Sequence, residues 1–132
     1  MISKATSPQL RAAFESHLGE TRDHIRRLEQ VFQMHGSQPT SATCPVIGGI
    51  IEEANDIAGD VADKNVLDAA LIAAAQAVEH YEMTRYGSLI AWAKTPERSD
   101  CAQVLQQTLA EEKAADEKLT SIAESGLNRQ AA

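Results

Sequence analysis

Acidic side chains interrupt the apolar faces of three separate segments, and this pattern constrains the fold more than any other feature. One face near the C-terminus recurs at intervals of three and four residues and consists of Cys101, Leu105, Thr108, Glu112, Ala115, Leu119 and Ile122. The preceding segment has the same spacing in Ile72, Ala75, Glu79, Met83, Tyr86 and Ile90. The first segment has one face with Ala13, His17, Glu20 and His24, beside an apolar stripe of Phe14, Leu18, Ile25, Leu28 and Phe32. This periodicity predicts long helices that share one core.

The carboxylates on these faces need a compensating partner. Glu112 lies at the centre of its stripe, Asp116 lies one turn further on, and Glu82 flanks the stripe that contains Glu79. A carboxylate buried alone is costly by several kcal/mol, so it must be paired, protonated or bound to a cation. Three helices that direct carboxylates toward one core therefore suggest a shared cation.

Length and composition indicate a single all-α domain over residues 1–132. The chain has 132 residues, enough for a core of its own, and its apolar content of 43% includes few aromatic residues. Runs of β-branched and aromatic residues are missing, which favours a helical bundle over a sheet. The net charge of −7 and the lack of a basic cluster disfavour a nucleic-acid partner.

The cysteines and the absence of targeting segments predict a cytoplasmic protein with no membrane partner. Cys44 and Cys101 lie far apart and match no metal or redox spacing, so we interpret them as reduced thiols. Neither has an identifiable activating neighbour in the sequence, which argues against a cysteine-based redox enzyme. No segment has the features of a signal peptide or the length of a transmembrane helix.

Helix-start and helix-stop signals divide the chain into three long helices and one shorter helix. We expect them over residues 8–34, 45–61, 66–94 and 96–125. Asn65 is a candidate cap for the third, and Thr95 with Pro96 suits the start of the fourth. Gly126 supplies a stop, and we expect a frayed tail after it. Short connections make neighbouring helices antiparallel.

Two interpretations remain open for the polar residues of the first helix. His17, Glu20 and His24 project from one face, and imidazoles and carboxylates at this spacing can point at one metal ion. Alternatively, they form a solvated face with a local Glu–His pair, which is the simpler interpretation of this helix alone.

The second acidic cluster also allows two interpretations. Glu79 and Glu82 are one helical turn apart and could share a cation, with Tyr81 and Tyr86 as hydrogen-bonding neighbours. Alternatively, a basic residue such as Arg85 neutralises one of them in a buried salt bridge.

The third cluster lies in the string LAEEKAADEKL. Glu112 and Asp116 fall on the core side and are candidate ligands. We expect the other two acidic residues to face water and to pair with nearby lysines; these four are Glu111, Glu117, Lys113 and Lys118.

Four strings together resemble the YciE/YciF family of bacterial ferritin-like stress proteins. They are LRAAFESHLGETRDHIRRLEQVF, GGIIEEANDIAGDV, DAALIAAAQAVEHYEMTRYGSL and TLAEEKAADEKL. The resemblance implies a ferritin-like antiparallel helical bundle, a carboxylate-rich di-metal site for iron or manganese, and a homodimer. It also implies a further long helix at the N-terminus, of which MISKATSP resembles only the tail and the following turn, so we expect an N-terminally truncated domain with an incomplete ligand set.

The family motifs fall on the same candidate residues. The motif HLEET matches residues 17–21, with Gly19 in place of the first glutamate and Glu20 as the second. The motif VEHYE matches residues 78–82, and AEEKATDEKL matches residues 110–119 with Ala115 in place of threonine. Within these motifs the chain keeps His17, Glu20, Glu79, Glu82, Glu111, Glu112 and Asp116.

Two functions from different classes follow. The first is a ferritin-like stress-response protein with a carboxylate-bridged di-metal site, whose enzymatic turnover the sequence leaves open. The alternative is a metal-free structural protein that dimerises through an apolar groove. Metal content of the purified chain distinguishes the two.

Overall fold

A computed structural model describes residues 1–95 and 97–132, and it confirms the predicted all-α bundle. The elements, in chain order, are α1 (Pro8–Met34), α2 (Pro45–Asp60), α3 (Lys64–Lys94), α4 (Ser99–Ile122), a π-helical turn η1 (Ala123–Leu127) and α5 (Asn128–Ala131). None of the described helices has the length and apolar character that a membrane span requires.

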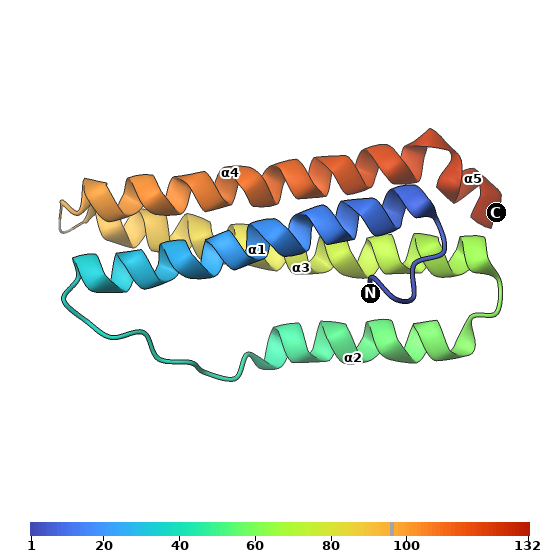
Figure 1. The fold of residues 1–132 in the computed structure, drawn as a ribbon, viewed down its shortest axis with the longest axis horizontal. Coiled ribbons are helices and arrows are strands. Elements are labelled where there is room, and N and C mark those ends of the chain that lie inside the picture. Colours follow the sequence, from blue (N-terminus) through green and yellow to red (C-terminus); the bar gives the residue numbers. More distant parts are fainter. Residues whose placement is uncertain (96) are drawn as a thin grey trace.

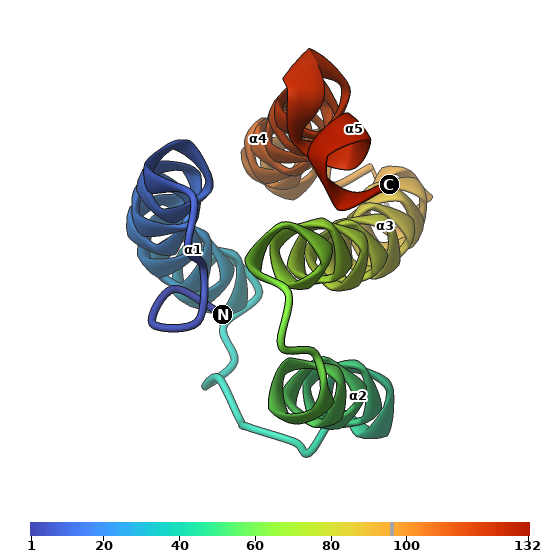
Figure 2. The same cartoon turned by 90° about the vertical axis from the view of Figure 1, so that its right-hand side faces the viewer.

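Helix α3 is the centre of the bundle. It packs against α4 on one side and α2 on the other, while α1 packs against α4 (Figure 1, Figure 2). Figure 1 shows α1 and α3 running in the same direction, with α4 running opposite to both. Figure 2 shows α2 set apart from α4, across α3. The three long helices therefore surround a common interior, and α2 covers the outer side of α3.

Two long helices begin at side-chain caps. The Ser7 hydroxyl accepts a hydrogen bond from the Leu10 N–H, and Pro8 occupies the first helical position, as expected. The prediction for α3 is wrong by two residues, because Asp63 and not Asn65 is the cap. The Asp63 carboxylate accepts hydrogen bonds from the N–H groups of Asn65 and Val66 at 2.8 and 3.1 Å, which allows the helix to begin at Lys64.

The start of the last helix and the tail that follows it also differ from the prediction. Thr95 is the C-cap of α3 and α4 begins at Ser99, while the expected first position, Pro96, lies outside the described residues. At the other end, Gly126 has φ 144°, so the helix breaks there as predicted. The tail is not frayed, since residues 128–131 form the short helix α5.

Two apolar clusters form the core, one toward each end of the bundle. The first joins the start of α1 to α3 and the end of α4, and its largest members are Leu10, Phe14, Leu71, Ile72, Leu119 and Ile122. The second joins the end of α3 to the start of α4 through Tyr86, Ile90, Ala93, Cys101, Ala102 and Leu105. These residues confirm the stripes predicted for α3 and α4. On α1, however, Leu18 and Ile25 of the predicted apolar stripe are 43% and 54% exposed.

Buried Asp68 on α3 anchors the segment before α1. Its carboxylate accepts hydrogen bonds from the Thr6 N–H, the Thr6 hydroxyl and the Ser7 N–H, each at 2.7 Å. Only 2% of Asp68 is exposed, so these three donors replace the water that the carboxylate loses on burial. The contact fixes the position at which α1 begins, and with it the register of His17 against α3.

We predict that Asp68→Ala lowers the free energy of unfolding by at least about 2 kcal/mol, because it leaves several donors without a charged acceptor. Urea unfolding monitored by circular dichroism measures the loss. The exposed Asp56→Ala on α2 is the control and should change it by less than about 0.5 kcal/mol. Equal stabilities of the two variants would show that Asp68 does not anchor the segment.

Candidate metal centre

Four of the predicted ligands meet in the interior of the bundle. They are His17 from α1, Glu79 and Glu82 from α3, and Glu112 from α4. One potential ligand atom of each lies within 4.8 Å of those of the others. Glu79 and Glu82 are adjacent because residues three apart share a helix face. The cluster lies between the two apolar clusters, where α1, α3 and α4 all contribute to the core.

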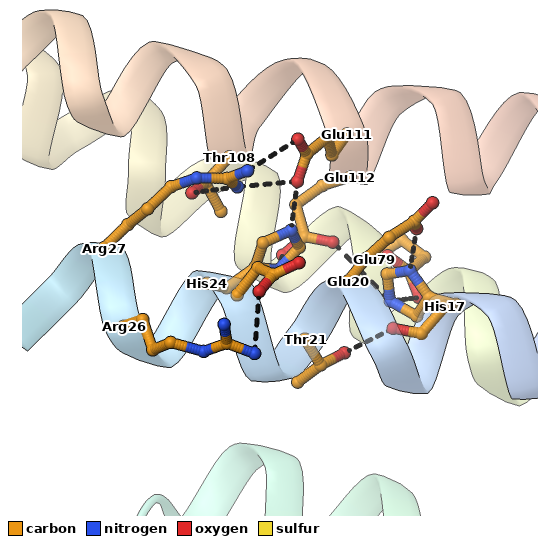
Figure 3. A network of polar contacts seen from close by, with 11 residues as sticks. His17, Glu20, Thr21, His24, Arg26, Arg27, Glu79, Thr108, Glu111 and Glu112 are labelled. Atoms are coloured by element: carbon orange, nitrogen blue, oxygen red, sulfur yellow. Dashed lines mark hydrogen bonds and ion pairs between the residues drawn. The ribbon is translucent and has the colours of Figure 1, made fainter.

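Two buried oxygen atoms of the cluster have no hydrogen-bond partner among the described residues. His17 Nε2 lies 3.2 Å from Glu79 Oε1 and 3.6 Å from Glu112 Oε2 (Figure 3). Glu79 and Glu112 are 3% and 1% exposed. Within the described part of the chain, Glu79 Oε2 and Glu112 Oε2 have no hydrogen-bond donor. An unpaired buried carboxylate oxygen is unusual and indicates an additional positive partner, such as a proton or a cation.

The electrostatics of the cluster also favour a positive partner. Burial, together with the negative charges of Glu112 and Glu79, raises the pKa of Glu82 to about 7. Burial raises the pKa of Glu79 in spite of its contact with His17. The hydrogen bond to Glu79 raises the pKa of His17 to about 9, in opposition to burial. The site therefore holds extra protons near neutral pH, and a metal ion could replace them.

The other predicted ligands lie around this cluster. Glu20 is 43% exposed along its side chain and contacts His17 Nδ1 at 3.0 Å, on the side of the ring away from Glu79. His24 is buried, with Nδ1 3.0 Å from Glu112 Oε1. Asp116 is one turn away, where it contacts Gln76 and His80 instead. Glu20 thus contacts the cluster through His17, and His24 contacts it through Glu112. The described contacts of Asp116 lie outside the cluster.

The prediction for Glu111 is wrong, because Arg27 of α1 takes the place expected for a lysine. Arg27 donates two hydrogen bonds to the Glu111 carboxylate, at 2.6 and 2.8 Å, and His24 Nε2 lies 2.8 Å from the same carboxylate. Arg27 follows His24 by three residues and so lies on the same face of α1. The spacing of His24 and Arg27 is a sequence signal that the two side chains lie together. It does not show that both contact Glu111 on α4.

Tyr81 and Arg85 do not take the roles that the sequence suggested. The Tyr81 hydroxyl lies 3.3 Å from Cys44 Sγ, and the Arg85 guanidinium lies 4.8 Å from the centre of the Tyr81 ring. Arg85 therefore interacts with an aromatic ring, and among the described residues it forms no ion pair with Glu79 or Glu82. Both cysteines are free, as predicted.

Comparison with known proteins places the chain in a family. Residues 1–132 match the family described as Domain of unknown function, DUF892. The chain belongs to this DUF892 family. Protein YciF of Escherichia coli K12 is 42% identical over 132 residues, which are 98% of this chain and 80% of YciF.

Two solved structures resemble this DUF892 chain along most of its length. The crystal structure of the E. coli stress protein YciF has a TM-score of 0.90 at 40% identity, and the match covers 96% of this chain and 80% of the YciF chain. The structure of YcfI from Rhodopseudomonas palustris has a TM-score of 0.88 at 51% identity, and the match covers 91% of this chain and 76% of YcfI. The predicted resemblance to the YciF group is therefore confirmed.

Two hollows lead to the cluster in this DUF892 domain. A cavity of about 140 Å³ opens between α1 and α4 and is lined in part by His17, Glu20 and Lys118. A second cavity, of about 340 Å³, lies between α1, α2 and α3, with apolar walls that include Ile47, Ile51 and Val78. His17 and Glu79 line both, so small ions or molecules can approach the cluster from two sides.

The raised pKa values predict how the stability of the metal-free protein depends on pH. Glu82 holds more protons in the folded than in the unfolded state between its ordinary pKa of 4.5 and about 7, and His17 does so between 6.5 and about 9. Stability falls with rising pH wherever the folded state holds more protons. The free energy of unfolding should therefore decrease from pH 5 to pH 9, by up to about 1.4 kcal/mol per pH unit for each retained proton.

Urea unfolding in the presence of a chelator, at several pH values, measures this dependence. His17→Gln should flatten the decrease between pH 6.5 and 9. His35→Gln, which replaces an exposed histidine after α1, should leave it unchanged. A free energy of unfolding that rises across this range in the wild type would contradict the electrostatics described here.

Proposed function

We propose that this protein is a ferritin-like stress-response protein that binds iron or manganese in the core of its helical bundle. The observation that carries the proposal is the cluster of His17, Glu79, Glu82 and Glu112, in which two buried carboxylate oxygens have no hydrogen-bond donor among the described residues. Membership in the family, and similarity to a protein described as a stress protein, support the physiological part of the proposal.

The donor set suits these metals. Carboxylate oxygens are preferred ligands of manganese, and imidazole nitrogen is a common ligand of iron. Ferritin-like bundles hold di-iron or di-manganese sites with glutamates and histidines that project inward from facing helices. Here three facing helices supply three glutamates and one histidine. A divalent ion would also offset the burial and the carboxylate repulsion that together raise the pKa of Glu82.

The finer form of the proposal is a pair of ions bridged by a carboxylate. Glu112 is the best candidate for the bridge, because Oε2 faces His17 while Oε1 contacts His24 Nδ1. His17 would serve one ion, and a second ion would have to replace the proton between His24 Nδ1 and Glu112 Oε1. Glu20 would hold the outer nitrogen of His17, an arrangement in which a carboxylate orients a ligating histidine.

Bound ferrous iron would supply the electrons that reduce oxygen or peroxide. The residues of this chain would bind the ion, keep it away from bulk water and hold protons nearby. The apolar walls of the larger cavity suit the approach of a small uncharged oxidant, and Glu20 at the smaller cavity suits the entry of a cation.

We predict that Glu112→Gln weakens Mn²⁺ or anaerobic Fe²⁺ binding by at least about tenfold, because it removes a charged ligand from the centre of the site. The matched control is Glu117→Gln, an exposed glutamate on the same helix, which should bind like the wild type. Isothermal titration gives the affinities, and elemental analysis distinguishes one ion per chain from two. A wild type that binds neither metal, or equal affinities of both variants, would refute the site.

The exposed apolar face of α1 supports a second proposal, that the protein is a homodimer. Leu18, Ile25 and Phe32 recur every seven residues and are 43%, 54% and 36% exposed. Pairing with a second copy would remove these side chains from water, and two-fold symmetry is the commonest closed arrangement. If the protein binds no metal, its function would be that of a structural protein that dimerises through this face.

Analytical ultracentrifugation tests the dimer. The wild type should sediment as a dimer at micromolar concentration, and Ile25→Lys should shift it toward monomer, because a charge in an apolar interface loses its hydration. Gln30→Lys adds the same side chain at an exposed position on another side of α1 and should remain dimeric. A monomeric wild type would overturn the proposal.

A further inference from the structure

A chain of charged side chains connects the surface of the bundle to Glu112. Arg27 donates hydrogen bonds from Nη1 and Nη2 to the two oxygens of Glu111. Glu111 Oε2 lies 2.8 Å from His24 Nε2, and His24 Nδ1 lies 3.0 Å from Glu112 Oε1 (Figure 3). The chain passes from α1 to α4, back to α1 and again to α4. It therefore fixes the separation of the two helices beside the cluster.

His17 in the cluster and His24 beside it each have a carboxylate on the ring nitrogen that faces away from the cluster, but the two carboxylates are held differently. Glu20, behind His17, is 43% exposed along its side chain and three residues away on the same helix. Glu111, behind His24, is 30% exposed and comes from another helix. It is held by the two-point contact with Arg27, whose Nη1 also lies 3.3 Å from the Thr108 hydroxyl. A two-point guanidinium–carboxylate contact fixes direction as well as distance.

Orientation of His24 determines the position of Glu112. The His24 ring is 3% exposed and lies between two carboxylates, so its tilt follows the position of Glu111. Glu112 Oε1 is within hydrogen-bonding distance of that ring, whereas Oε2 has no donor among the described residues. In the metal-free protein, the contact with His24 is thus what directs the free Oε2 toward His17 and Glu79.

We propose that Arg27 is a positioning residue, which orients Glu112 for metal binding by holding Glu111 and, through it, His24. The role rests on the proposed function, because the group that Arg27 positions is the central ligand. It depends on the forked shape of the guanidinium and not on its charge alone. Lysine, with the same charge and a single nitrogen, should not replace it.

The test uses Co²⁺ as a probe, because the visible absorption of the bound ion reports its coordination geometry. Arg27→Lys keeps the charge and removes the two-point contact. We expect a loss of Co²⁺ affinity of about 10- to 100-fold, the usual range for partners that orient a ligand, together with a changed absorption spectrum. The control, Arg26→Lys, alters an exposed arginine that pairs with Asp23 on the same helix, and should keep the wild-type affinity and spectrum.

A second variant covers the case in which Arg27→Lys does not fold. Glu111→Gln keeps the size of the side chain and weakens the contacts on both of its sides, so it should also lower the affinity and change the spectrum. Wild-type affinity and spectrum in the folded variants, with Co²⁺ bound normally by the wild type, would overturn the role of Arg27 and leave the proposed function standing. No Co²⁺ binding by the wild type would overturn both.

Discussion

The central physical constraint on this protein is the burial of two glutamates, with a third half-buried beside them, at the point where its long helices meet. Glu79, Glu82 and Glu112 come from α3 and α4, and His17 faces them from α1. Each carboxylate loses hydration on burial, and their mutual repulsion adds to that cost. An apolar core of the same size would be easier to fold. Helix packing alone does not require this polar interior, which is why we propose that a cation binds there.

The rest of the fold supports this polar centre from both ends. An apolar cluster lies on each side of it, and the contact of Asp68 with Thr6 and Ser7 determines where α1 begins. On one side, Arg27 and Glu111 connect α1 to α4. On the other, two cavities bring solvent close to His17 and Glu79. The centre is thus held by contacts between α1 and α4 around His24 and is accessible around His17.

The sequence predicted most of the fold and the core of the site, because helical periodicity determines which side chains share a face. It placed Glu79 and Glu112 on buried faces and His17 near them, and the structure confirms that placement. It failed where contacts depend on how the helices are packed. The pairing of Glu111 with Arg27 joins residues 84 positions apart, and spacing within a helix carries no information about it.

The most direct measurement is anomalous diffraction from a crystal of this chain soaked with Mn²⁺ or anaerobic Fe²⁺, recorded at the absorption edge of the metal. A metal bound as proposed would give an anomalous peak between His17, Glu79, Glu82 and Glu112, at about 2.0–2.3 Å from their ligand atoms. A second peak between Glu112 and His24 would establish the bridged pair. A crystal with no peak among these residues, or with peaks only at surface carboxylates, would contradict the account.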